Sequence, residues 1–409
     1  MINRTILSQI EMSVKSRPVT LVTGARQVGK STLVQLFVEK GFKYVTLDDY
    51  REMEIAKNDP MMFLQMHPWP LIIDEIQKAP GLFNALETVV NREKMNNKHN
   101  YGMYIITGSQ IYRLMKGVTE SMAGRISIIH MSPLSRNEVL NREEPPFDFN
   151  LINIARRANA SPLPVNDLFK MIVKGFYPEI YSNELLTPEK FYADYVEAYI
   201  ERDVSEIINI KDKYTFRRFM ELLASLTGEE LIYDNIARLI GVDIKTIQSW
   251  ISILLAGDII YLLEPYNEYS ITKRIVKRPK VYFSDTGLAS YLAKVNSPET
   301  LQSSFLCGRF VETYIVNELR KSYLNNGKSP NFYYYRDTRM NEIDLIVIND
   351  GKLHRVECKT GINFNLTAVN SFKQVEKTKY KLSTSLIICN TDIMYPLAED
   401  IYVVPLAGI

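Results

Sequence analysis

The feature that most constrains this chain is a glycine-containing loop close to its N-terminus. The eight residues from Gly24 to Ser31 read Gly-Ala-Arg-Gln-Val-Gly-Lys-Ser. An apolar run at 19–22 precedes the loop and predicts a buried strand, and the apolar spacing after Lys30 predicts a helix. Glycines at both ends of such a loop let successive backbone N–H groups point at phosphate oxygens, beside the positive end of the helix dipole. The spacing therefore predicts a phosphate-binding loop, because a simple glycine turn would not need this strand and helix around it.

Two side chains of the loop have separate roles in this interpretation. Lys30 can reach the β- and γ-phosphates of a nucleoside triphosphate, and the Ser31 hydroxyl can take one position on Mg²⁺. We therefore expect ATP and Mg²⁺ as the cofactors. The residues expected to contact the nucleotide are Gly24, Ala25, Arg26, Gln27, Val28, Gly29, Lys30, Ser31, Thr32 and Ser109.

A pair of carboxylates follows the apolar run at 71–73. Asp74 and Glu75 stand where this predicted strand ends. Ligands of open α/β sheets lie beyond the carboxyl ends of the strands, so both side chains should lie beside the phosphate-binding loop. Asp74 is the expected partner of Ser31 at the metal, and Glu75 is placed to polarise a water for attack on the γ-phosphate. The alternative is that the two acids only cap the next helix.

Two later segments complete the predicted sheet. Thr107 and Ser109 follow an apolar strand, and either hydroxyl could bind the γ-phosphate or the attacking water, or merely cap a helix. Arg125 precedes the last strand, at 126–129, and is expected to assist hydrolysis from a neighbouring subunit of a homo-oligomer. An ordinary surface arginine is the alternative. Five strands separated by helices predict a parallel, three-layer α/β sheet. The residues expected to be catalytic are Lys30, Glu75 and Arg125.

These motifs together resemble the AAA+ ATPases. The narrower resemblance is to a prokaryotic group of AAA+ proteins with a C-terminal domain of uncharacterised function. The segments that carry it are 24–31, 71–75, 106–109 and 121–125, with further similarity at 175–179, 199–204 and 281–288. The group usually has a second glycine before Phe-Pro-Glu, whereas this chain has Lys174 and Tyr177 around that turn. The resemblance implies ATP binding and hydrolysis and spans nearly the whole chain.

Composition sets limits on the partners. Net charge is +2 over 409 residues, so any surface for nucleic acid must be local. The three cysteines form no Cys-x-x-Cys pair, which favours a reducing compartment over a disulfide framework. No run approaches the roughly 18 apolar residues of a membrane span, and the N-terminus has no apolar signal core. A cytoplasmic protein with no membrane partner is expected.

The middle of the chain predicts a winged helix-turn-helix. Residues 141–164 are polar and contain prolines, which predicts a linker. Helices at 233–240 and 244–255 flank a turn at Gly241, and a strand follows at 259–263. Side chains expected to face outward are Lys245, Gln248 and Ser249, and the basic run after them supplies Lys273, Arg274, Lys277, Arg278 and Lys280. This unit is expected to contact DNA, unless it is a packing module with a solvated basic surface.

The last part of the chain carries a second set of acids. Asp344 and Glu357 stand on adjacent predicted strands, Lys359 lies on the same strand face as Glu357, and Glu312 lies on a preceding helix. Such residues can hold Mg²⁺ at a phosphate. The pattern resembles the PD-(D/E)XK nucleases, which implies a restriction-endonuclease-like α/β domain. Domains of this kind either cleave DNA or only bind it.

The predicted organisation has four parts. An AAA+ P-loop domain (1–145) is followed by a linker and helical region (146–215), a winged helix (216–298) and a nuclease-like domain (299–409). The expected function is a Mg²⁺-dependent ATPase whose hydrolysis changes the conformation of the C-terminal half, acting on DNA. Two alternatives stay open, an ATP-gated metal-dependent DNA nuclease and a nucleotide-controlled scaffold with little turnover.

Overall fold

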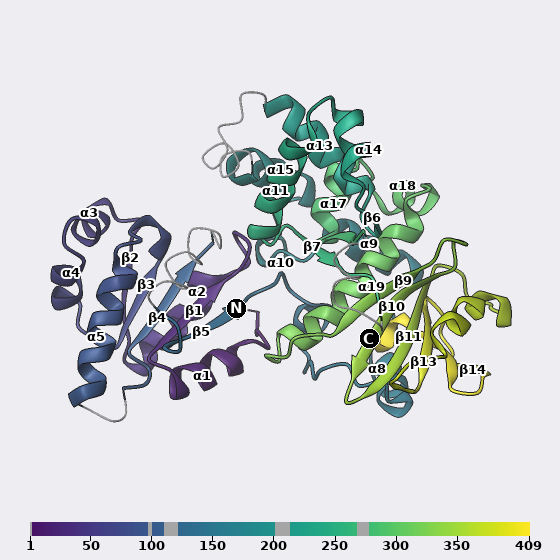
Figure 1. Cartoon of the computed structure of the whole chain (residues 1–409), viewed down its shortest axis with the longest axis horizontal. Coiled ribbons are helices and arrows are strands. Elements are labelled where there is room, and N and C mark those ends of the chain that lie inside the picture. Colours follow the sequence, from purple (N-terminus) through teal and green to yellow (C-terminus); the bar gives the residue numbers. More distant parts are fainter. Residues whose placement is uncertain (1, 97–99, 110–121, 201–212, 268–277) are drawn as a thin grey trace.

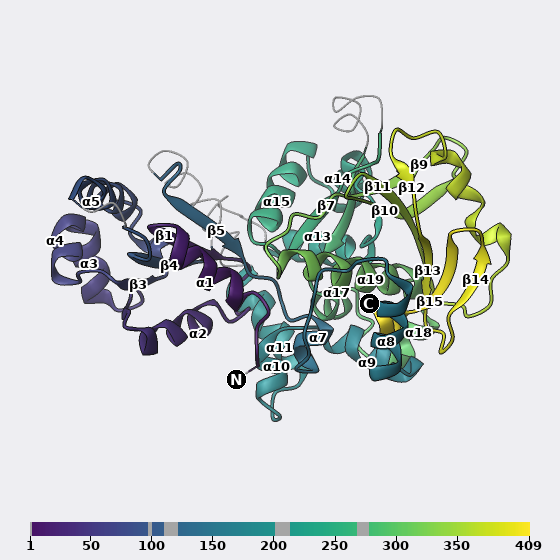
Figure 2. The same cartoon turned by 90° about the horizontal axis from the view of Figure 1, so that it is seen from below.

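The structure is a computed structural model that describes residues 2–96, 100–109, 122–200, 213–267 and 278–409. Three bodies can be seen in Figure 1: an N-terminal sheet domain, a mostly helical middle unit, and a C-terminal sheet domain. Figure 2 shows the same arrangement from below. The sequence motifs at 199–204 and the basic residues Lys273, Arg274 and Lys277 lie partly or wholly outside the described residues.

The N-terminal domain is built on a five-stranded parallel sheet, as predicted. Its strand order is β2 (Lys43–Thr46), β3 (Leu71–Asp74), β4 (Tyr104–Gly108), β1 (Val19–Thr23) and β5 (Ile126–His130). β1, β3 and β4 are fully buried, which explains their continuous apolar sequences.

Helices cover both faces of this sheet. Alternate residues point to opposite sides, so that Val22 belongs to one core cluster and Leu21 to the other. The first face packs against α1 (Leu7–Ser16) and α2 (Lys30–Val34), and the second against α3 (Tyr50–Asn58), α4 (Pro60–Met66) and α5 (Leu82–Asn96). Single 3₁₀ segments lie at Gln35–Lys40 and Ile76–Lys78, and α7 (Arg136–Val139) follows the sheet. The result is the predicted three-layer arrangement.

The middle unit comprises the described residues between 165 and 303. Its helices are α9 (Val165–Lys174), α10 (Pro178–Ser182), α11 (Pro188–Tyr195) with a π-helical turn at Val196–Ile200, α13 (Lys213–Ser225), α14 (Tyr233–Ile240), α15 (Ile244–Ala256), α17 (Thr286–Leu292) and α18 (Pro298–Ser303). A small antiparallel sheet has the order β6 (Glu229–Glu230), β8 (Lys280–Phe283), β7 (Ile260–Leu263). α14 and α15 meet at 106° across a turn in which Gly241 has φ +84°.

Two of the motifs shared with the narrower group meet inside the middle unit. The Asp285 carboxylate accepts hydrogen bonds from the Phe176 N–H (2.7 Å), the Tyr192 hydroxyl (2.7 Å) and the Leu288 N–H (2.8 Å). Gly175 has φ +71°, and a Cβ on it would lie 2.0 Å from the Tyr192 hydroxyl. Only glycine fits there, so these motifs have a structural explanation: they join α9 and α10 to α17.

The C-terminal domain has a mixed sheet in the order β14 (Tyr395–Ala398), β15 (Ile401–Pro405), β13 (Ser385–Cys389), β11 (Lys352–Lys359), β10 (Glu342–Asn349) and β9 (Phe332–Arg336). β12 (Lys381–Leu382) pairs with β11. The long helix α19 (Cys307–Leu324) packs against β11, and the chain ends in a 3₁₀ turn at Leu406–Gly408. A 3₁₀ segment, Leu366–Val375, with non-helical backbone at Val369, lies between β11 and β12 in the chain.

The predicted linker at 141–164 is wrong in part. Residues 151–160 form α8 (Leu151–Ala160), which packs against β15 and the 3₁₀ turn at the end of the chain. Asn150 caps this helix through hydrogen bonds to the Ile152 and Asn153 N–H groups. The cause is amphipathicity: Ile154 and Ala158, one helical turn apart, are both buried. The prolines on either side of this helix favour a continuous loop when only the sequence is considered.

Within the described ranges, no single helix has the length and apolar character that a membrane span requires. The helices α14 and α15 meet the requirements of length and apolar composition only when they are counted together, and the chain bends by 106° between them.

Candidate nucleotide-binding site

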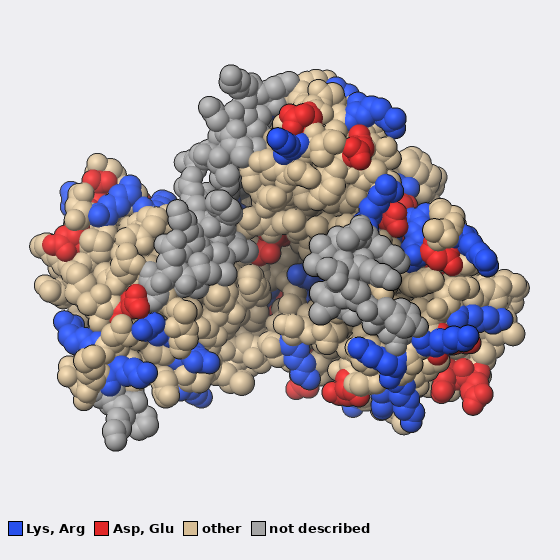
Figure 3. All heavy atoms as spheres, in the orientation of Figure 1, with Lys and Arg blue, Asp and Glu red and all other residues tan. Residues whose placement is uncertain are grey.

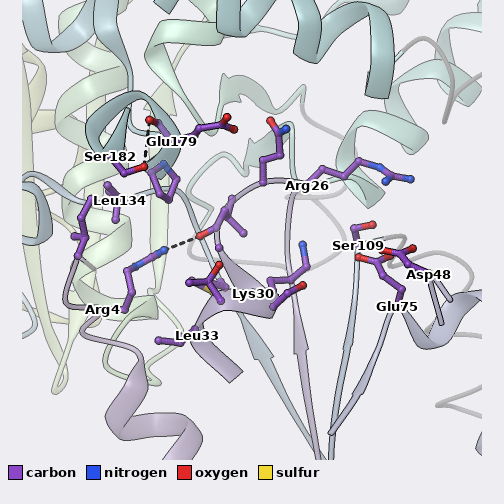
Figure 4. Close-up of a pocket in the computed structure, with 18 of the residues that line it drawn as sticks. Arg4, Arg26, Lys30, Leu33, Asp48, Glu75, Ser109, Leu134, Glu179 and Ser182 are labelled. Atoms are coloured by element: carbon purple, nitrogen blue, oxygen red, sulfur yellow. Dashed lines mark hydrogen bonds between the residues drawn. The ribbon is translucent and has the colours of Figure 1, made fainter. Parts of the chain in front are cut away.

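A cavity of 750 Å³ lies at the carboxyl edge of the N-terminal sheet, where a nucleotide would fit. The β1–α2 loop forms its floor (Figure 4). One end is polar and lined by Arg26, Lys30, Asp48, Glu75 and Ser109. On the other side Leu134 lies with Arg4, Glu179 and Ser182 (Figure 4), and Met131 and Pro178 lie near Arg4 beside Gly29. Lys30 and the loop backbone suit phosphates, and the apolar side chains suit one face of a base.

The loop has the backbone that its glycines predicted. Gly24 has φ +141°, and a Cβ there would lie 2.2 Å from the Met131 carbonyl oxygen. Gly29 has φ +94° and directly precedes α2. Lys30 is buried, and its ammonium donates hydrogen bonds to the carbonyl oxygens of Gly24 (3.0 Å) and Ala25 (2.6 Å). Burial lowers the pKa of Lys30 to about 8, against the opposing attraction of Glu75.

The Asp74 carboxylate accepts hydrogen bonds from hydroxyl groups on three different elements. The Ser31 hydroxyl donates to Oδ1 (2.9 Å), the Tyr44 hydroxyl donates to Oδ2 (2.8 Å), and the Thr107 hydroxyl also donates to Oδ1. The predicted pair of Ser31 and Asp74 is therefore in direct contact. A hydroxyl and a carboxylate are oxygen ligands suited to Mg²⁺ that takes its remaining positions from phosphate and water. The residues present fit that ion.

Glu75 has an unusual backbone conformation. Its φ is +59°, which is uncommon for a residue other than glycine, and such conformations often occur at functional sites. The carboxylate lines the cavity and accepts a hydrogen bond from the Gln77 amide. Burial raises the pKa of Glu75, and the nearby Lys30 opposes this rise. A partly desolvated carboxylate beside the phosphate loop is suited to bind and orient a water.

Thr107 and Ser109, whose roles the sequence left undecided, have different surroundings in the structure. Thr107 faces Asp74 and also accepts a hydrogen bond from the Glu75 N–H (3.3 Å). Ser109 lines the cavity, and its buried Oγ has no hydrogen-bond partner among the described residues. Thr107 therefore supports the metal-side carboxylate, whereas Ser109 presents an unsatisfied hydroxyl to the cavity.

Arg125 lies at the other edge of the sheet. It directly precedes β5, and its carbonyl accepts a hydrogen bond from the N–H of Val19, the first residue of β1. Its side chain donates to the Asn91 amide oxygen (2.8 Å) and pairs with Glu87 at 3.4 Å, both on α5. Arg125 does not line its own cavity, so its catalytic role stays a prediction that requires a second subunit.

Several cavity residues were missed from the sequence. Arg4 donates to the Val28 carbonyl in the loop (2.7 Å) and to the Ser132 carbonyl (2.6 Å), and pairs with Glu138 at 3.2 Å. Glu179 and Ser182 line the cavity from α10 of the middle unit. Arg4 lies in a segment with no motif, and α10 is about 150 residues from the loop in sequence, so local spacing gave no signal for either beyond the Pro-Glu pair at 178–179.

The acids predicted in the C-terminal domain come together, with two partners that were not predicted. Glu357 pairs with Lys359 (2.8 Å), and Asp344 accepts a hydrogen bond from the Cys358 N–H (2.8 Å). Glu312 is paired with Lys280 at 2.8 Å, and Lys280 also pairs with Glu342. Burial raises the pKa of Glu312 to about 7 and raises that of Glu357 well above its usual range. In the described part of the chain, no group of three or more His, Cys, Asp or Glu is arranged to hold a metal ion.

The DNA role predicted for Lys280 is therefore wrong. Its side chain is 1% exposed and lies against acids of the C-terminal domain, so it cannot reach a phosphate backbone. β8 is the central strand of its small sheet, which explains the burial. Of the basic run, Arg278 is described and exposed.

Comparison with known proteins gives three consecutive matches along the chain. Residues 16–140 match the model of an AAA domain, residues 165–299 match a domain of unknown function (DUF8612), and residues 307–409 match another (DUF4143). An uncharacterised protein of Mycobacterium tuberculosis and one of Mycobacterium bovis are each 24% identical over 404 residues, covering 98% of this chain and 83% of the relative.

Solved structures give weaker similarities. The Walker-type ATPase of Pyrococcus abyssi has a TM-score of 0.40 and 14% identity, over 71% of this chain and 96% of that one. DnaA of Aquifex aeolicus bound to AMPPCP has a TM-score of 0.29 and 12% identity, over 60% and 84%. The N-terminal domain has the fold of the P-loop AAA+ ATPases, as the parallel sheet and the AAA match show. A separate mixed-sheet domain follows at the C-terminal end.

The lowered pKa of Lys30 makes nucleotide affinity depend on pH. With a pKa of about 8 in the free pocket, about 90% of Lys30 is charged at pH 7 and about 10% at pH 9. Phosphates bind the charged form, so ATP binding takes up a proton and weakens as pH rises. We expect the Kd for ATP, measured by calorimetry, to rise about tenfold from pH 7 to pH 9. A flat profile across this range would contradict the role of the buried ammonium.

Proposed function

We propose that this protein is a Mg²⁺-dependent ATPase that uses ATP hydrolysis to change how its middle unit and C-terminal domain sit on the N-terminal domain, and that it acts on DNA. The observation that carries the proposal is one cavity lined by the loop, by Ser31, whose hydroxyl donates to Asp74 behind it, and by Glu75, with α10 of the middle unit forming part of its wall.

Binding divides between the two ends of the cavity. Backbone N–H groups of the loop and the Lys30 ammonium would hold the β- and γ-phosphates. Ser31 and Asp74 would hold Mg²⁺, which neutralises phosphate charge when bound. The base would lie against apolar side chains on the Arg4 side of the cavity, such as Leu134 and Met131.

Hydrolysis needs a water aligned with the γ-phosphate. Glu75 would orient this water and accept its proton, with the Ser109 hydroxyl as a second contact. Arg26 extends over the polar end of the cavity in Figure 4 and would add positive charge near the γ-phosphate in the same subunit. Arg125 would add charge from a neighbouring subunit, which requires a homo-oligomer.

Coupling to the rest of the chain would follow direct contacts. The Tyr195 hydroxyl donates to the Arg26 carbonyl at 3.5 Å, and the Tyr177 hydroxyl donates to Tyr195 at 2.9 Å. Tyr177 adjoins the Gly175–Phe176 turn that Asp285 holds at the start of α17. A change in the loop on loss of the γ-phosphate therefore has a short path of buried tyrosines into the middle unit.

A winged helix-turn-helix in the middle unit is the proposed DNA contact. The order α13, β6, α14, α15, β7, β8 and the 106° angle between α14 and α15 support it. Lys245 and Gln248 are exposed on α15, opposite its buried Ile247 and Trp250. On the face shown in Figure 3, basic and acidic side chains are interspersed over the described residues, so the DNA surface would be local.

The alternative of a nucleotide-controlled scaffold makes a different prediction for turnover. We expect Glu75→Gln to keep ATP affinity within about threefold while lowering steady-state phosphate release at least about 100-fold, because it removes only the group that activates water. Lys30→Ala should lose ATP binding in calorimetry. Wild-type protein that binds ATP but releases no phosphate, with or without duplex DNA, would favour the scaffold; undiminished release by Glu75→Gln would refute the role of Glu75.

The role of Arg125 can be tested by mixing two inactive proteins. Lys30→Ala has no working nucleotide site but keeps Arg125, whereas Arg125→Ala keeps the site and lacks the arginine. If Arg125 acts on a neighbouring subunit, each variant alone should be nearly inactive and an equimolar mixture should regain a fraction of the wild-type phosphate release. A mixture no more active than its parts would contradict action between subunits.

The DNA contact can be tested on α15. Lys245→Ala should weaken duplex DNA binding in fluorescence anisotropy and reduce the slope of log K against log [salt] by about one, because one phosphate contact is lost. Lys170→Ala, an exposed lysine on α9 paired with Asp167, is the matched control and should leave both values unchanged. Equal behaviour of the two variants would argue for a packing role of α15.

A further inference from the structure

A lysine from the middle unit is buried among the acids of the C-terminal domain. The Lys280 ammonium, on β8, lies 2.8 Å from Glu312 Oε1 on α19 and 2.5 Å from Glu342 Oε1 on β10. It also lies over the Tyr334 ring, 5.5 Å from its centroid. Lys280 is 1% exposed, so nearly all of its interactions are with protein groups.

This lysine stays charged in its buried position. Burial alone would lower the pKa of Lys280, but Glu312, Asp344 and Glu342 outweigh burial and raise it. The Tyr282 hydroxyl donates to the same Glu312 oxygen at 2.5 Å. A buried charge is tolerated only when it is paired and its hydrogen bonds are satisfied, and the lysine and its carboxylates meet both conditions.

The same contacts place a positive charge beside the carboxylates that a nuclease would offer to a metal. Glu312 Oε1 already accepts two hydrogen bonds, from Lys280 and Tyr282. Asp344 Oδ2 accepts from the Cys358 N–H, and Glu357 accepts from Lys359 and from the Ser371 hydroxyl at 3.2 Å. A divalent cation bound to Glu312 or Glu342 would lie next to the Lys280 ammonium, and one bound to Asp344 would be exposed to the same charge, so Lys280 would repel it. The residues present therefore do not fit the metal that the nuclease resemblance implies.

We infer that Lys280 is the built-in cation of this acidic cluster, which therefore takes no divalent metal while β8 is docked on the C-terminal domain. The cluster comprises Glu312, Glu342, Asp344, Glu357 and Lys359 together with Lys280.

The residues of the cluster come from two parts of the protein, which indicates a structural role for it and not the cleavage of DNA. Lys280 belongs to the middle unit, whereas the carboxylates belong to α19, β10 and β11 of the C-terminal domain. The ion pairs therefore join the middle unit to the C-terminal domain, which serves here as the surface on which β8 docks. This inference is independent of ATP hydrolysis and of DNA contact by α15.

The experiment is a titration with Mn²⁺ followed by electron paramagnetic resonance, in the absence of nucleotide so that the ATP site contributes no metal binding. Wild-type protein should bind no Mn²⁺ at the cluster, so its signal should equal that of Asp344→Asn. Lys280→Met removes the charge while keeping the length of the side chain, and it should gain a site for about one Mn²⁺ per chain. The double variant Lys280→Met, Asp344→Asn should lose this site.

Lys359→Met is the matched control, because it removes the other lysine of the cluster and leaves Lys280 in place. It should bind no Mn²⁺. A second readout is the melting temperature, which Mn²⁺ should raise for Lys280→Met and leave unchanged for wild-type protein.

Wild-type protein that binds Mn²⁺ in a manner lost in Asp344→Asn would overturn the inference. So would a folded Lys280→Met that gains no site, or a gain in Lys359→Met alone. If Lys280→Met does not fold, the comparison of wild-type protein with Asp344→Asn decides by itself.

Discussion

Parallel strands that end at one edge of a sheet are the constraint on which the candidate site depends. β1 leads into the loop, β3 ends at Asp74, and β4 ends just before Ser109. Because β4 lies between β3 and β1 with every pair parallel, these three endings converge without any further adjustment. Thr107 shows how close they are, since it bridges the Asp74 carboxylate and the Glu75 N–H.

This constraint explains how much of the site could be predicted from the sequence. Gly24, Lys30 and Ser31 are recognised by local spacing, and Asp74 by its place after an apolar strand, so each needs only short-range patterns and one topological rule. Arg4 could not be found in this way, since its contacts with Val28 and Ser132 depend on how separate segments pack.

For Lys280 the local sequence pattern predicts the wrong environment. Its neighbours in sequence are basic, and a run of basic residues predicts a solvated or DNA-facing surface. Its position is decided instead by Glu312 and Glu342, which lie 32 and 62 residues later in the chain. α8 differs in part, because the spacing of Ile154 and Ala158 carries a local helical signal that the flanking prolines obscure. What covers that apolar face lies at the far end of the chain and, like the partners of Lys280, is not encoded by spacing.

The position of α8 has a consequence for how this architecture can be divided. The helix lies before the middle unit in sequence, yet it packs with β15 and the last 3₁₀ turn, where Ile154 contacts Gly408. The C-terminal domain is therefore discontinuous, with the whole middle unit inserted between its first helix and its remaining residues. Recombination that exchanged the last hundred residues alone would leave α8 behind with its apolar face uncovered, so this domain is expected to be inherited together with the insertion that interrupts it.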